Sequence, residues 1–324
     1  MNNRLRNLIA LSCVLFALVG GSESRAESDF KVTLLGTGTP IPSPNRYGPS
    51  TLVEAGDQNL LFDAGRGVPI RLAQHKASGG KIDVLFLTHF HSDHTAGIAD
   101  LWLTSWLPRR VWGWGGRITP FRVIGPVGTK SLTSNLEKAY AADIKIRIEE
   151  TKLPPEGIAI AAEEFDKDGV VYEKNGVKVI AFEVDHGPAV KPAYGYRIEY
   201  KGRSVVISGD TRYHQNVIKY GTGADVLIHE VAGARPELMT KIFAERLAVA
   251  HVTPREAGML FSQTKPKMAV YTHLLLLYSD KIPPPTPDDL IAQTRETYSG
   301  PLEVGEDLIS FEIGDTVTVR RYKP

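Results

Sequence analysis

Short apolar runs that end in a histidine or an aspartate recur along the chain. The run Val84–Leu87 has the character of a buried strand and leads directly into Thr88–His94, which holds three histidines and one aspartate. Similar runs end at His186, at Asp210, at His229-Glu230 and at His273. Because buried strands that end at one edge of a sheet sandwich bring their last side chains together, the pattern predicts a single cleft lined by these residues.

Turn residues between apolar runs predict hairpins. The predicted pairs are Ser50–Glu54 with Asn59–Phe62, Val170–Tyr172 with Val177–Ile180, and Tyr194–Tyr200 with Ser204–Ile207. Asn175-Gly176 in the middle pair is the strongest signal, because both residues tolerate the positive φ of a type I′ turn. We expect the whole segment 143–184 to form a run of strands, and 308–320 to form two more.

Helices are expected between these strands, over 68–75, 97–106, 255–263 and 288–299, with another that ends at Tyr140. The third has a clear start, because Thr253 is a good N-cap and Pro254 suits the first helical position. His251 therefore comes just before a helix N-terminus, where the positive end of the helix dipole favours a neutral imidazole.

Composition adds the size and class of the molecule. The chain has 324 residues, 42% hydrophobic and 23% charged, which is ordinary for a globular protein and indicates neither disorder nor a body embedded in a membrane. No internal repeat or low-complexity linker is present. We therefore expect residues 27–324 to form one domain.

The first 26 residues have the features of a secretory signal peptide. Arg4 and Arg6 precede the apolar run Leu8–Val19, and Ser24 and Ala26 are small residues at the positions that a signal peptidase reads. The run is shorter than the roughly 20 apolar residues that span a bilayer, so a membrane anchor is the second choice. The expectation is an exported protein, periplasmic or secreted, with no membrane contact after cleavage.

Removal of that segment changes the chemistry that remains. Cys13 is the only cysteine, so the mature chain would have no disulfide and would ligate metals through histidine and carboxylate alone. The segment contains three arginines and one glutamate, so its removal would change the formal net charge of the chain from +1 to −1. A near-neutral chain has no electrostatic footprint for nucleic acid, so none is expected as a partner.

The segment 88–94 has a spacing that can hold two metal ions. On an extended strand end, residues two apart point the same way, so His89 and His91 can face one ion. The following turn lets Asp93 and His94 face a second. A polar turn without a metal is the alternative.

Three further features have two interpretations each. Asp63, at a strand end, could accept a proton from a ligand histidine or cap the next helix. His229, Glu230 and His251 could act in catalysis or form a buried hydrogen-bond cluster. The aromatic and basic patch could be a substrate wall beside the metals, or a core helix with a surface loop. Its members are Trp102, Trp106, Arg109, Arg110, Trp112, Trp114 and Arg117.

These residues together resemble the metallo-β-lactamase fold superfamily. Its His-x-His-x-Asp-His signature matches His89, His91, Asp93 and His94, and its later His, Asp and His match His186, Asp210 and His273. The resemblance implies an α+β fold, a four-layer αββα sandwich with the site at one edge. It implies two Zn²⁺ ions per chain: His89, His91, His186 and Asp210 on one, and Asp93, His94, Asp210 and His273 on the other.

Within that superfamily the chain is similar to the ribonuclease Z group, through Gly36–Pro40, Asp63–Gly65, His229–Ala232 and His251–Thr253. Members that process tRNA usually carry a long basic arm between the ligands that match His186 and Asp210, and here only a hairpin fits between them. With a predicted signal peptide as well, the chain looks most like exported arylsulfatase-type relatives, and tRNA processing is not expected.

The expected activity is zinc-dependent hydrolysis of small sulfate or phosphate esters by a water activated between two metal ions. Asp93 is expected to ligate and to orient the nucleophile, and His251, held by Glu230 and His229, to stabilise developing charge or protonate the leaving oxygen. The alternatives are a lactone or β-lactam hydrolase, a ribonuclease Z-like nuclease, and a non-catalytic metal-binding protein. The expected partner is a small anionic ester; the sequence leaves a homodimer open.

Overall fold

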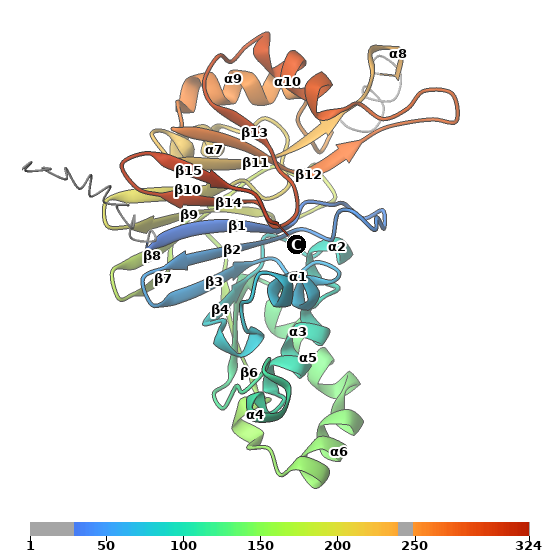
Figure 1. Ribbon diagram of the computed structural model, residues 1–324, viewed down its shortest axis with the longest axis vertical. Helices are drawn as coiled ribbons and strands as arrows, with labels where there is room; N and C mark the ends of the chain where they lie inside the picture. The colour runs from blue at the N-terminus through green and yellow to red at the C-terminus, as the bar shows by residue number, and fades with distance from the viewer. Residues whose placement is uncertain (1–28, 239–248, 324) are drawn as a thin grey trace, which may run out of the picture.

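Two β-sheets lie against each other at the centre of the molecule, and helices cover their outer faces (Figure 1). The computed structural model describes residues 29–238 and 249–323. Buried side chains form three clusters, one between the sheets and one beneath each helical layer. These layers make the molecule the predicted four-layer αββα sandwich of the α+β class.

The first sheet has eight strands. In spatial order they are β15 (Val317–Arg320), β14 (Ser310–Ile313), β1 (Phe30–Gly36), β2 (Ser50–Ala55), β3 (Gln58–Phe62), β4 (Val84–Phe86), β5 (Phe121–Pro126) and β6 (Ile160–Phe165). From β3 to β6 neighbouring strands are parallel, so their carboxyl ends lie at one edge. The loop that leaves β4 at this edge carries His89–His94.

The second sheet has seven strands. In spatial order they are β13 (Leu302–Val304), β12 (Met268–Leu276), β11 (Val226–Gly233), β10 (Arg203–Ile207), β9 (Tyr194–Tyr200), β8 (Val177–Glu183) and β7 (Gly169–Lys174). The predicted hairpins are confirmed, and Asn175 and Gly176 both have positive φ, at 51° and 80°. β9 and β10 form the short hairpin predicted between His186 and Asp210.

Helices cover both sheets. The helices over the first sheet are α1 (Val68–Gln74), α3 (Ile98–Trp106), α5 (Thr129–Ala139) and α6 (Ala141–Thr151), with the short α2 (Ser92–Thr95) and α4 (Arg109–Trp112). The helices over the second sheet are α7 (Gln215–Gly221), α9 (Pro254–Thr264) and α10 (Pro287–Arg295), with the short α8 (Pro236–Leu238). Thr253 caps α9 through a capping box with Glu256, as the sequence indicated.

Three predicted boundaries are wrong. The segment that begins at Asp143 is the helix α6 rather than a strand; its Ile144 and Ile148, one helical turn apart, pack on the core beneath the first sheet. Neither β11 nor β12 ends at its histidine: β11 runs on past Glu230 to Gly233, and β12 past His273 to Leu276.

Among the described residues, every helix is too short or too polar to cross a membrane. The predicted signal peptide at residues 1–26 lies outside the described residues.

Candidate metal centre

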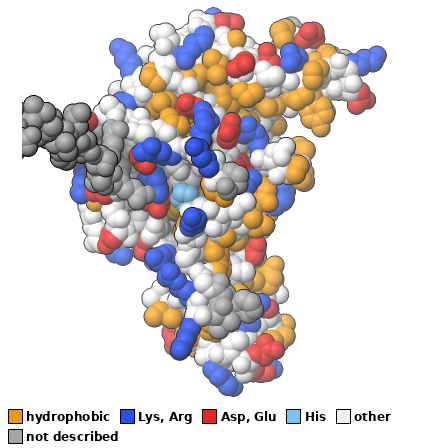
Figure 2. Space-filling view, viewed as in Figure 1, with side chains coloured by type: hydrophobic (Ala, Val, Ile, Leu, Met, Phe, Trp, Pro, Cys, Tyr) orange, Lys and Arg blue, Asp and Glu red, His pale blue; other side chains and the backbone are white. Residues whose placement is uncertain are grey.

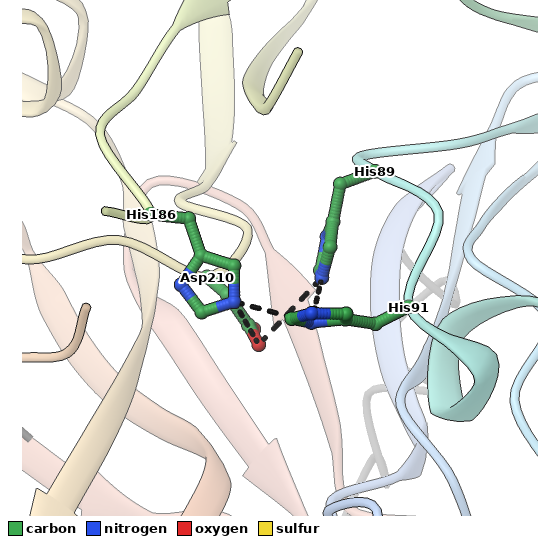
Figure 3. A group of neighbouring side chains, drawn as sticks. All are labelled: His89, His91, His186 and Asp210. Atoms are coloured by element: carbon green, nitrogen blue, oxygen red, sulfur yellow. Dashed lines mark hydrogen bonds and ion pairs between the residues drawn. The ribbon is translucent and has the colours of Figure 1, made fainter. Parts of the chain in front are cut away.

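The first group of candidate ligands combines side chains from both sheets. His89 and His91 follow β4, whereas His186 and Asp210 follow β8 and β10 (Figure 3). His91 Nδ1 lies 3.0 Å from His89 Nε2 and 3.2 Å from His186 Nε2. One atom from each of the four residues fits within a common span of 4.8 Å, which is the spacing of ligands around one ion.

The second group lies against the first and contains Asp93, His94 and His273. His273 Nε2 lies 3.3 Å from Asp93 Oδ2 and 3.2 Å from Asp210 Oδ2. Asp210 Oδ2 is also 3.4 Å from His94 Nε2 and 3.9 Å from His89 Nε2. One carboxylate oxygen therefore lies between the two groups, and the structure brings together all seven residues expected to ligate.

Hydrogen bonds behind the cluster set the tautomers of its rings. Thr88 Oγ1 donates to Asp63 Oδ2 at 2.8 Å, so it accepts from His89 Nδ1 at 2.9 Å. His94 Nδ1 donates to Asp63 Oδ2 at 2.7 Å, and His186 Nδ1 donates to the carbonyl of Ala250 at 3.0 Å. In the neutral form of these three rings, Nδ1 carries the proton and donates it to a group outside the cluster. Nε2 is then unprotonated, and its lone pair faces the centre of the cluster.

Asp63 thereby takes the first of its two predicted roles. It holds His94 and Thr88, while α1 begins after Gly67 without a side-chain cap. Its backbone has a φ of 58°, an unfavourable region for a residue with a Cβ. The chain accepts this local strain where it fixes a ligand ring.

The positions of the ring protons show whether the cluster is suited to bind cations. Without a positive charge, the Nε2 lone pairs of His89, His94 and His186 would point at the anionic oxygen of Asp210, which is repulsive. Burial lowers the pKa of His94, but Asp210 and Asp63 outweigh this and raise it well above its usual value, so a proton can take that place. Asp93 Oδ1 and His94 Nε2 are buried without a hydrogen-bond partner in the described part. Imidazole and carboxylate donors of this kind suit a pair of divalent metal ions.

His273 reaches the cluster through a β-bulge. β11 and β12 pair in register up to Glu230 opposite Thr272, and then resume with Val231 opposite Leu274, which leaves His273 as the extra residue. Its φ of 44° turns the chain out of the regular strand conformation. A bulge next to a site re-aims one side chain while the strand continues.

Glu230 and His251 lie beside the candidate ligands. Glu230 Oε1 is 3.3 Å from His251 Nδ1 and accepts a hydrogen bond from the backbone of Val252. Burial lowers the pKa of His251, but the Glu230 carboxylate outweighs this and raises it to about 9. One ring atom of His251 lies within 4.8 Å of ligand atoms of Asp210 and His273, so the imidazole borders the space where a substrate would meet the ions.

His229 lies on the other face of β11. Neighbouring residues of a strand point in opposite directions, so His229 cannot share the direction of Glu230. Its ring packs against Phe261 of α9, and its Nδ1 donates to the carbonyl of Glu230. Of the two residues expected to hold His251, only Glu230 therefore faces it.

Four members of the tryptophan and arginine patch, Trp102, Trp106, Arg109 and Trp114, lie away from this centre. Trp102 and Trp106 are fully buried beneath the first sheet, where their indole N–H groups donate to the carbonyls of Ile158 and Pro154. Arg109 and Trp114 border a cavity on another part of the molecule. The side chain of Trp112 is outside the described part. Of the two interpretations left open for the patch, the core helix holds for Trp102 and Trp106, because α3 turns both indoles into the core beneath the first sheet.

Asp307 braces the centre from behind, which the sequence did not indicate. Its carboxylate accepts from Thr37 N and Oγ1, from Tyr47 N and from the Arg71 guanidinium, all at 2.7 to 3.0 Å. The carbonyl of Thr37 in turn accepts from the backbone of Leu274, the residue after His273. The acidic residue thus joins three segments that are distant in sequence.

The β-lactamase superfamily domain matches residues 58–274, a span that includes all seven candidate ligands. The chain belongs to the metallo-β-lactamase superfamily. Curated relatives include ribonuclease Z of Mycobacterium bovis (strain BCG / Pasteur 1173P2), 37% identical over 290 residues, which cover 87% of this chain and 98% of the relative. Ribonuclease Z of Mycolicibacterium gilvum (strain PYR-GCK) is 36% identical, with 86% of this chain and 94% of the relative covered.

Solved structures share the superfamily fold. The metallo-β-lactamase fold protein YhfI from Bacillus subtilis has a TM-score of 0.65 at 21% identity, covering 87% of this chain and 98% of its own. Human tRNase Z, short form, has a TM-score of 0.64 at 22% identity, covering 86% of this chain and 98% of its own. At these identities the likeness concerns the fold alone.

The comparisons overturn three expectations for this superfamily member. Its curated relatives are ribonucleases, so the expected small ester as partner, with nucleic acid excluded, is wrong. The expected likeness to exported arylsulfatases has no support among them. The expected export, whether periplasmic or secreted, was based on the predicted signal peptide and is contradicted, because the curated relatives are ribonuclease Z proteins.

The short hairpin of β9 and β10 does not set this chain apart from its curated relatives. The alignment to the Mycobacterium bovis relative spans 290 residues and uses 87% of a 324-residue chain, so a long arm present in the relative alone has no place in it. The spacing between His186 and Asp210 therefore does not separate this chain from proteins named ribonuclease Z.

Replacement of Asp63 tests the support behind His94. We expect Asp63→Asn to weaken metal affinity by about 10- to 100-fold, because an amide holds the Nδ1 proton less firmly and lowers the basicity of the ring. Competition with a chromophoric chelator measures the change. Asp100→Asn removes an exposed carboxylate from α3 and is the control. Equal affinity in the two variants would contradict the role given to Asp63.

Replacement of Asp307 tests the brace. We expect Asp307→Asn to lower the free energy of unfolding by about 3 kcal/mol, because the Arg71 guanidinium, 13% exposed, would lose its carboxylate. Urea denaturation measures the loss. Asp315→Asn, which removes a fully exposed partner of Arg203, is expected to change it by less than about 0.5 kcal/mol. A similar effect of both substitutions would contradict the proposed brace.

Proposed function

We propose that the protein is a metal-dependent phosphodiesterase that cleaves RNA. One observation carries the proposal: five histidines and two aspartates converge from both sheets, with the Nε2 lone pairs of His89, His94 and His186 turned inward, beside an imidazole whose Nδ1 lies 3.3 Å from Glu230 Oε1. Two relatives named ribonuclease Z, aligned over 98% and 94% of their length, support phosphodiester bonds of RNA as the target.

Two metal ions, with zinc as the first candidate, would be held by the residues of the two groups. His89, His91, His186 and Asp210 would hold one ion, and Asp93, His94, His273 and Asp210 the other. When bound, such a pair supplies an activated water and positive charge for the developing phosphorane oxygens.

The residues of the chain then supply orientation and a proton. Asp93, fixed by His273 at 3.3 Å, is placed to orient the attacking water as well as to ligate. His251 would donate a proton to the leaving ribose oxygen, because Glu230 Oε1 lies 3.3 Å from its Nδ1 and one of its ring nitrogens lies within 4.8 Å of ligand atoms of Asp210 and His273. Glu230 is a positioning residue, since it acts only through His251.

The test is an activity screen on the purified chain after chelation and reloading with zinc or manganese. We expect the reloaded protein to cleave RNA transcripts, and the chelated protein to leave them intact. Cleavage of a nitrophenyl phosphodiester together with inertness toward nitrophenyl sulfate would support a phosphodiesterase. Metal-loaded protein that leaves every RNA in the panel intact would overturn the proposal.

A further inference from the structure

A groove runs along the edge of the first sheet opposite the metal centre. Two cavities of about 590 and 430 Å³ adjoin there and share Asn59, Lys81 and Ile82. They lie where β3, β4 and β5 begin, whereas the candidate ligands His89–His94 follow the end of β4. We call this feature the basal groove.

The basal groove is lined by an excess of positive charge. Its six basic side chains are Lys76, Lys81, Arg109, Arg117, Arg122 and Lys174. Its carboxylates are Glu54, Asp57 and Asp83, and Glu54 is already paired with Lys31 and His75. Figure 2 shows Lys and Arg side chains on the lower part of the visible face, near β4 and α4.

Most of these cations lack an acidic partner. Within the described part of the chain, only Arg122 has a carboxylate within ion-pair distance, that of Glu163 at 2.6 Å. Asp57 and Asp83 accept instead from amide groups, of Gln58 and Asn175 and of the Asn59 backbone. Several positive charges of the groove are therefore available to bind an anionic ligand.

Arg117 is the buried member of the set. It is 5% exposed, and its Nη2 donates to the carbonyls of Gly79 and Ile82, while its Nε has no hydrogen-bond partner in the described part. Burial lowers the pKa of Arg117 to about 10, so the guanidinium remains charged at neutral pH. Within the described part of the chain Arg117 has no carboxylate at ion-pair distance, and the nearby Asp83 offsets only part of the effect of burial. A buried cation without a direct partner is costly to the fold, and a bound anion would offset that cost.

Two aromatic residues complete the wall. Tyr172 lines the larger cavity, and its hydroxyl donates to Gln58 Oε1. Trp114 lines the smaller cavity, with its indole N–H on Thr104 Oγ1 at 3.2 Å. Basic side chains interleaved with aromatic rings are the usual composition of a groove that follows a nucleic-acid strand.

We propose that the basal groove binds the phosphate backbone of the RNA substrate at a distance from the scissile bond. This rests on the proposed function. Asp83 in the groove lies six positions before His89, so roughly 20 Å of extended chain lies between groove and metal centre. An RNA strand that reaches both contacts the protein twice, and the groove supplies affinity that the net charge of +1 does not indicate.

The test compares two double variants of equal charge. Lys81→Gln/Lys174→Gln removes two exposed cations of the groove and leaves the buried Arg117 in place. Lys219→Gln/Lys265→Gln removes two exposed cations from α7 and the end of α9, over the other sheet. For both, KM and kcat are measured on RNA across a range of salt concentrations, and on a nitrophenyl phosphodiester too small to reach the groove.

We expect the groove variant to raise KM for RNA by about tenfold, with turnover of the small diester unchanged. The slope of log KM against log salt is expected to fall by about 0.7 for each RNA phosphate that the groove no longer neutralises. The control variant is expected to match the wild type on both substrates.

Three other results would overturn the inference, and they are distinguishable. Wild-type protein that turns over the small diester but neither binds nor cleaves RNA would remove the proposed function together with the groove. RNA cleavage with the same KM and salt slope in the groove variant would remove the groove alone. Loss of inorganic phosphate or pyrophosphate binding without a change in KM for RNA would assign the groove to a small anion.

Discussion

Asp210→Ala is expected to abolish RNA cleavage and to leave the purified protein with less than two metal ions per chain. Asp210 Oδ2 faces Nε2 atoms of His89, His94, His186 and His273 at 3.2 to 3.9 Å, so one carboxylate oxygen borders both groups of candidate ligands. Metal ions supply several kcal/mol of charge stabilisation in the transition state, so the expected loss in kcat is about 10³-fold or more.

Metal analysis and kcat of the same preparation make this measurement. Asp210→Asn is a useful companion, because it keeps the shape of the side chain and removes the negative charge. Far-UV circular dichroism establishes that both variants are folded. Two tightly bound ions and near wild-type turnover in Asp210→Ala would remove the shared carboxylate from the mechanism, and with it the proposed pairing of the sites.

His251→Ala is expected to lower kcat for RNA by about 10²- to 10⁴-fold while both metal ions stay bound. The imidazole is held by Glu230 and lies beside the ligand cluster without belonging to the two principal groups. A general acid matters only where the leaving oxygen needs a proton. A nitrophenolate leaves without one, so turnover of a nitrophenyl phosphodiester is expected to fall much less than turnover of RNA.

This difference between substrates separates catalysis from support. If His251 and Glu230 only brace the sheet edge as a buried hydrogen-bond cluster, His251→Ala slows both substrates equally and lowers the melting temperature. Glu230→Gln extends the test, since a positioning residue is expected to give the same substrate pattern with a smaller loss. Unchanged RNA turnover in His251→Ala would contradict any role in the reaction.

Local sequence signals predicted the elements that depend on nearby residues. Asn175-Gly176 specified a hairpin because its backbone needs are purely local, and Thr253-Pro254 specified a helix start for the same reason. The segment 143–151 failed because isoleucines at every second position satisfy a strand pattern. The same segment also places Asp143 and Arg147 one helical turn apart, where they form an ion pair. Ile144 and Ile148 lie on one face of that helix and pack on the core, and this packing favours the helix over the strand.

The site was predicted as a set of residue types, but its geometry was not. Nothing local in Thr272-His273-Leu274 indicates a bulge, because the extra residue is defined only by pairing with β11. The role of Asp307 likewise arises from contacts with Thr37, Tyr47 and Arg71, far away in sequence.

Net charge misled the prediction about nucleic acid, because it sums over the whole surface. Acidic residues elsewhere offset the total. Within the described part of the chain, Lys76, Lys81 and Lys174 of the basal groove have no carboxylate at ion-pair distance, so the net charge does not reveal this locally basic surface.

The origin of the candidate ligands has a consequence for cohesion between the two halves of the sandwich. His89, His91, Asp93 and His94 belong to the first sheet, whereas His186, Asp210 and His273 belong to the second. Ions held as proposed would cross-link the halves in the way that a disulfide does in other proteins. Free metal at a hundred times the dissociation constant would then add about 2.7 kcal/mol per site, so the resistance of this protein to heat would follow the metal supply of its surroundings.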